Sequence, residues 1–71
     1  MKMMRTVTEE ELLNGLQALM NQYIKYRDRY GEEDTLTMMY YEWMIGAKEL
    51  VEMVLECPVN LQKDGKVTLW D

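Results

Sequence analysis

Apolar residues between positions 8 and 31 recur at intervals of three and four, the spacing that lines one face of an α-helix. Thr8 and Glu11 have the arrangement of a capping box, and Gly31 suits the helix end. The regular apolar positions are Leu12, Leu16, Leu19, Tyr23, Tyr26 and Tyr30. We therefore predict a helix over residues 8–31, with Gln17 among the polar residues of its wet side.

A second helix is predicted over residues 34–57. Asp34 and Thr35 are both good N-caps, and Pro58 disfavours a helical conformation at Cys57. Its regular apolar positions, which we call the seam, are Leu36, Tyr40, Trp43, Ala47, Leu50, Val54 and Cys57. Because the connection between the helices is short, we expect an antiparallel hairpin in which the seam packs on the first helix.

The second helix also carries a shorter apolar stripe, which consists of Met38, Tyr41 and Ile45. A helical projection places this Met/Tyr stripe among acidic residues, on the side away from the seam. A helix that is apolar on two sides is normally covered on both. Since two helices leave nothing to cover the stripe, we expect a second copy of the chain or another protein to bind it.

Alternating apolar and polar residues after Pro58 predict a β-hairpin over residues 59–70. A two-residue turn would divide its apolar residues between two faces. A three-residue loop over 63–65, with Gly65 left-handed, places all four on one face, so we predict that loop. The pairs in this register are Leu61 with Val67 and Val59 with Leu69.

The pattern as a whole predicts a single small α+β domain, in which an antiparallel two-helix hairpin is followed by a C-terminal β-hairpin. Residues 1–7 are expected to be extended. Because they leave the helix pair at the end where the β-hairpin starts, they could add a third strand to it.

The chain has 71 residues, so its core is small and self-association would stabilise it. Cys57 has no second cysteine to pair with, and the chain has no histidine, so we expect no disulfide within the chain, no metal and no cofactor. The sequence also has no leader-like segment and no apolar run of the roughly 20 residues that span a bilayer. We therefore expect a cytoplasmic homodimer without a membrane contact.

The chain has few of the residue types that usually carry out catalysis. The chain has neither histidine nor serine, so Cys57, at the C-terminus of the predicted second helix, has no imidazole to activate it. Thirteen acidic residues against eight basic ones give a net charge of −5, which disfavours direct nucleic-acid binding and suits a basic partner. The sequence therefore predicts a protein that is not an enzyme.

Two groups of residues are candidates for binding. Met and aromatic residues are enriched at protein interfaces, so the Met/Tyr stripe and the acidic residues around it form the first group. Its members are Met38, Tyr41, Glu42, Ile45, Glu49 and Glu52. The second group is Tyr26, Arg27 and Tyr30, where a cation projects between aromatic rings as a ligand site or as half of a charge pair.

These features favour a small acidic interaction protein that regulates or inhibits another macromolecule, as a homodimer. One alternative is a nucleic-acid mimic that inhibits a DNA- or RNA-binding enzyme, in the manner of small phage inhibitors of host defence, an analogy of size and charge. Another alternative is a small nucleotide or ligand binder at Tyr26, Arg27 and Tyr30.

Overall fold

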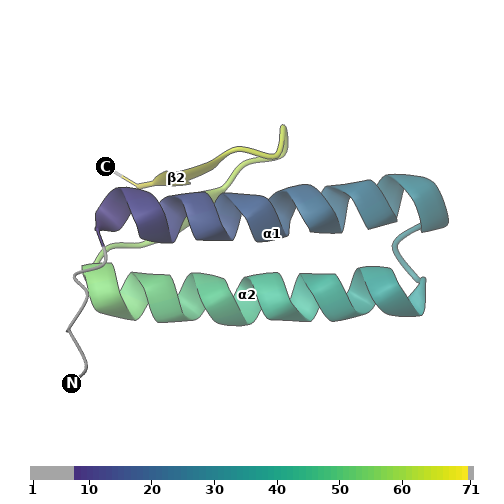
Figure 1. Cartoon of the computed structure of the whole chain (residues 1–71), viewed down its shortest axis with the longest axis horizontal. Coiled ribbons are helices and arrows are strands. Elements are labelled where there is room, and N and C mark those ends of the chain that lie inside the picture. Colours follow the sequence, from purple (N-terminus) through teal and green to yellow (C-terminus); the bar gives the residue numbers. More distant parts are fainter. Residues whose placement is uncertain (1–7, 71) are drawn as a thin grey trace, which may run out of the picture.

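The computed structural model describes residues 8–70 and has the predicted α+β architecture, with two antiparallel helices followed by a two-stranded antiparallel sheet (Figure 1). The elements are α1 (Glu9–Tyr30), α2 (Thr35–Leu55), β1 (Val59–Leu61) and β2 (Val67–Leu69). The strand suggested for residues 1–7 lies outside the described residues.

Both ends of α1 form as predicted. The Thr8 hydroxyl accepts a hydrogen bond from the Glu11 N–H at 3.1 Å, and the Glu11 carboxylate accepts one from the Thr8 N–H at 3.2 Å. Gly31 follows the helix with φ 93°, and its N–H donates to the Arg27 carbonyl. Glycine suits this position because a Cβ is strained at positive φ.

α2 begins as predicted but ends two residues early. Asp34 is its N-cap and accepts a hydrogen bond from the Leu36 N–H at 2.9 Å. The helix ends at Leu55 rather than at Cys57, because Glu56 takes up a left-handed conformation with φ 53°. Pro58 therefore sets only the last position at which α2 could end. Glu56 ends the helix earlier and turns the chain before β1 starts.

The register of the β-hairpin is confirmed. The Gln62 N–H donates to the Lys66 carbonyl at 2.9 Å, and the Gly65 N–H donates to the Gln62 carbonyl at 3.0 Å. Gly65 has φ 95°, as expected for the left-handed residue of a three-residue loop. The pairs are Val59 with Leu69, Asn60 with Thr68 and Leu61 with Val67.

The core lies between the helix pair and the β-hairpin. β1 contacts α2 and β2 contacts α1, so the hairpin covers one face of the pair. In Figure 1 the hairpin runs back along the helices only part of the way toward the loop that joins them. The buried apolar residues are Leu16, Met20, Met44, Val51, Val59 and Val67.

α2 turns a different side inward from the one that we predicted. Its buried residues are Thr37, Met44 and Val51, each one position after a member of the seam. A shift of one residue along a helix corresponds to a rotation of about 100° about its axis. α2 is rotated in this way because it must face α1 and the β-hairpin together, whereas the prediction considered α1 alone. The exposed seam residues are Leu36 (44%), Trp43 (52%), Leu50 (61%) and Val54 (60%).

Candidate functional site

The first candidate surface is the face of the helix pair opposite the β-hairpin, which we call the open face. It consists of the exposed seam residues of α2 together with the neighbouring aromatic residues of α1. With about 150–250 Å² for a fully exposed large side chain, Tyr30 and the four exposed seam residues leave about 500 Å² open. Half-buried neighbours raise this area toward the roughly 800 Å² that each partner buries in a standard interface.

A row of four aromatic rings crosses the open face from α1 to α2. Tyr30 stacks on Tyr26 with ring centroids 5.8 Å apart, and Tyr26 stacks on Tyr40 at 4.8 Å. Tyr40 in turn meets Trp43 edge to face at 5.2 Å. Such contacts hold the rings in place, so the face presents a preorganised apolar surface.

Arg27 contacts Tyr23 and Asp28, whereas Tyr26 and Tyr30 stack on each other. Its guanidinium lies 5.6 Å from the ring centroid of Tyr23, and it pairs with Asp28 at 3.3 Å rather than with the acidic residues of the loop. The two tyrosines belong instead to the aromatic row. A nucleotide site built from these three residues stays a prediction.

A second candidate is a pocket at the loop end of the helix pair, which we call the loop-end pocket. Its volume is about 310 Å³, and its lining residues are Tyr23, Glu32, Met38, Tyr41 and Glu42. Three residues of the predicted partner-binding group thus come together here. The rings of Tyr23 and Tyr41 are 5.4 Å apart and inclined at 53°, so they form a corner between α1 and α2.

The other three residues of the predicted partner-binding group, Ile45, Glu49 and Glu52, lie outside this pocket. Ile45 is half-buried and packs against the core, so the Met/Tyr stripe is exposed only at Met38 and Tyr41. Glu49 is exposed on α2. Ile45 is covered because it lies on the side of α2 that faces the β-hairpin, which the prediction left out.

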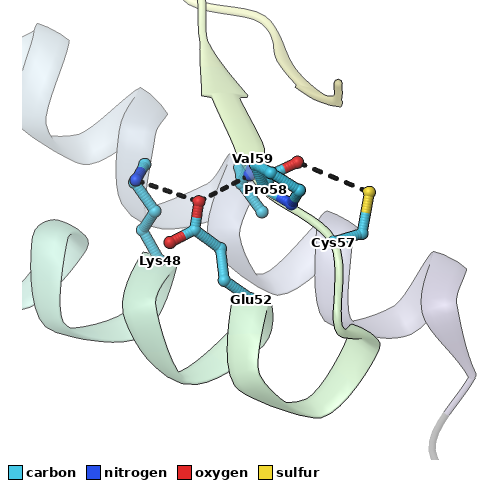
Figure 2. Close-up of polar contacts among 5 residues, drawn as sticks. All are labelled: Lys48, Glu52, Cys57, Pro58 and Val59. Carbon is cyan, nitrogen blue, oxygen red and sulfur yellow. Dashed lines mark hydrogen bonds and ion pairs between the residues drawn. The ribbon is translucent and has the colours of Figure 1, made fainter. Parts of the chain in front are cut away.

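Glu52 is engaged within the fold, as Figure 2 shows. Its Oε2 accepts a hydrogen bond from the Val59 N–H at 2.7 Å and one from Lys48 Nζ at 3.1 Å. The bond from the Val59 backbone, and after it the contacts with Lys48, lower the pKa of Glu52. Since Val59 opens β1, Glu52 anchors that strand to α2, a role that the prediction of a partner contact did not include.

Gln17 has the matching role on α1, which the sequence did not reveal. Its Nε2 donates to the Gly65 carbonyl at 2.6 Å, and its Oε1 accepts from the Val67 N–H at 2.9 Å. The outer edges of β1 and β2 are therefore each tied to a helix by one side chain. We had placed Gln17 on the wet side of its helix, because glutamine suits a solvated face equally well.

Cys57 is a half-buried free thiol whose Sγ lies 3.6 Å from the Pro58 carbonyl oxygen (Figure 2). The same Sγ lies 3.4 Å from the Trp70 carbonyl oxygen. Over residues 8–70, no three side chains of the metal-binding types converge, and neither helix is both long and apolar enough to cross a membrane.

No protein-family model matches the chain, and no curated protein or solved structure is significantly similar to it.

Proposed function

We propose that this chain is a small, acidic, non-enzymatic interaction protein that forms a homodimer through its open face and regulates another macromolecule by binding it. The observation that supports this proposal is the seam of α2, which neither α1 nor the β-hairpin covers at Leu36, Trp43, Leu50 and Val54. Its alternation of three- and four-residue steps is the pattern by which one helix packs along another.

A second copy suits the open face because the seam is nearly symmetric about Ala47. Trp43 precedes Ala47 by one helical turn and Leu50 follows it by almost one turn, so an antiparallel copy would bring the two large side chains opposite each other. Ala47 at the centre is half-buried against the core of its own protomer, so the second copy would contact the large exposed residues on either side of it. The seam has no charged member, so covering it removes little polar surface from water.

The test is the absolute mass in solution, measured by light scattering on a sizing column. The wild type is expected at twice the protomer mass of 8.5 kDa. Leu50→Glu is expected to be a folded monomer with an unchanged far-UV spectrum, because Leu50 is 61% exposed and supports little of the fold.

The size of the effect follows from the area that Leu50 would lose to a partner. About 100 Å² in each copy, at about 25 cal/mol per Å², contributes about 5 kcal/mol to the dimer. The dissociation constant should therefore rise by about 1,000-fold or more. Asn14→Glu adds the same charge at an exposed position of α1 and should leave the dimer intact. A wild type that is monomeric throughout, or a dimeric Leu50→Glu variant, would contradict the proposal.

A second candidate function is nucleic-acid mimicry, which is favoured by a line of exposed carboxylates along α2. Glu42 and Glu49 are exposed and seven residues apart, so they lie on one side of α2 about 10 Å apart, and the exposed Glu56 follows the end of the helix. A chain with these three residues changed to glutamine should then lose most of its binding to a nucleic-acid-binding enzyme. Added salt should also weaken the binding of the wild type to that enzyme steeply. Salt-insensitive binding that the triple change leaves intact would exclude this candidate.

A further inference from the structure

The loop-end pocket joins aromatic walls to carboxylates that pair with no other residue of the described range 8–70. Tyr23 and Tyr41 form the inclined corner, Met38 adds a polarisable thioether, and Glu32 and Glu42 bring two negative charges. Neither glutamate forms a hydrogen bond or an ion pair with another residue in the described part of the chain. In Figure 1 the β-hairpin stops short of this end of the helices, and no hairpin residue lines the pocket.

We propose that the loop-end pocket receives an arginine side chain from a basic partner protein. This inference rests on the proposed function, because it gives the chemistry of the macromolecule that the dimer binds. It also uses a surface that is separate from the open face, since the pocket shares no residue with the seam.

A guanidinium matches the pocket in both of its parts. Its planar face stacks on tyrosine rings, and its fork of N–H groups pairs with carboxylates in two-pronged contacts. Ammonium groups make neither contact as well, because they are compact and strongly hydrated. The volume of about 310 Å³ is at the lower end for ligand sites, which suits one side chain rather than a whole cofactor.

Arg27 shows that Tyr23 already accepts this kind of contact. Its guanidinium carbon lies 5.6 Å from the centroid of the Tyr23 ring, within the range of a cation–π interaction. Asp28 pairs with Arg27 at 3.3 Å, so the charge of Arg27 does not neutralise the two glutamates of the pocket. The net charge of −5 further attracts a basic surface and speeds its approach.

The test is a titration of the full chain with N-acetyl-arginine amide, followed by the NMR shifts of the Tyr23 and Tyr41 rings and the Met38 methyl group. Saturable shifts of these signals are expected. Glu42→Gln should raise the dissociation constant by about fivefold or more, because it removes one charge partner of the guanidinium. Glu49→Gln is the matched control, since Glu49 is exposed on the same helix but does not line the pocket.

The probe set makes the outcome decisive. N-acetyl-citrulline amide has nearly the same shape without the charge and should not saturate, and N-acetyl-lysine amide should bind more weakly than the arginine probe. The inference is overturned by an absence of saturable shifts, by equal binding of the citrulline probe, by tighter binding of the lysine probe, or by equal weakening in Glu42→Gln and Glu49→Gln.

Repeating the titration with Leu50→Glu separates this inference from the proposed function. The pocket is complete within one protomer, so the arginine probe should bind to the monomeric variant as it does to the wild type. Failure of the dimer test would leave that titration unchanged. Failure of the titration would leave the mass measurement unchanged.

Discussion

The attachment of the β-hairpin to α1 depends heavily on one side chain, which makes Gln17→Met an informative change. Methionine has nearly the length of glutamine and a similar helix propensity, but it can neither donate to the Gly65 carbonyl nor accept as strongly from the Val67 N–H. The variant therefore removes both hydrogen bonds to the β-hairpin with little change of shape. It also removes the exposed bond that Gln17 Nε2 donates to Asn21 on the same helix at 3.1 Å.

The expected loss can be worked from those two contacts. Each hydrogen bond contributes a net of about 1 kcal/mol, and a buried N–H left without a partner costs about 1–3 kcal/mol. Val67 is 8% exposed, so water reaches its N–H poorly. The sum is a loss of about 2–4 kcal/mol. A domain of 71 residues has roughly 4–10 kcal/mol in total, so this loss is a large share of its stability.

Urea unfolding followed by far-UV circular dichroism, at one fixed protein concentration, measures this loss. With a slope of about 1 kcal/mol per M, the midpoint should fall by about 2 M or more. Hydrogen exchange at the Val67 amide should also become faster. Gln22→Met is the control, because Gln22 is exposed on the same helix. A midpoint for Gln17→Met within about 0.5 M of that of Gln22→Met would refute the assigned role of Gln17.

Two further changes test other contacts. The pKa of Glu52 is lowered from its ordinary value of 4.5, first by the Val59 N–H and then by Lys48, so its stabilising effect is present above pH 4.5 and is lost as pH falls through the lowered pKa. In the wild type the urea midpoint should therefore fall as the pH is lowered from neutral to acidic values. Glu52→Gln should make this fall smaller, whereas Glu49→Gln should leave it unchanged. Thr37→Val should stabilise the chain by about 1 kcal/mol, raising the melting temperature by about 5 °C, because the Thr37 hydroxyl is buried without a partner. A lower melting temperature would show that this hydroxyl is satisfied in solution.

The features that the sequence predicted correctly are the ones with local causes. The capping box at Thr8, the glycine end of α1 and the loop at Gly65 each depend on residues a few positions apart, so neighbouring residue types are enough to recognise them. The end of α2 was placed too late because Glu56 takes a left-handed turn that non-glycine residues rarely signal.

The candidate site was predicted only in part, because it depends on contacts between distant segments. Met38, Tyr41 and Glu42 share one helix face and could be grouped from spacing alone. Tyr23 and Glu32 joined them only once α1 and the loop were placed beside α2. The roles of Gln17 and Glu52 were hidden for the same reason, since a polar side chain that bonds to a strand edge looks in sequence like any solvated one.

The orientation of α2 carries the more general lesson. Its two apolar sides were both visible in the sequence, and we assigned the more regular one to α1. Inside the protomer, however, α2 meets α1 and the β-hairpin together, and packing against two unlike neighbours does not require a strict repeat. Sustained alternation of three- and four-residue steps is needed where two helices lie along each other over many turns. The seam residues that the protomer leaves exposed are Leu36, Trp43, Leu50 and Val54, and it is for these that we propose a partner helix.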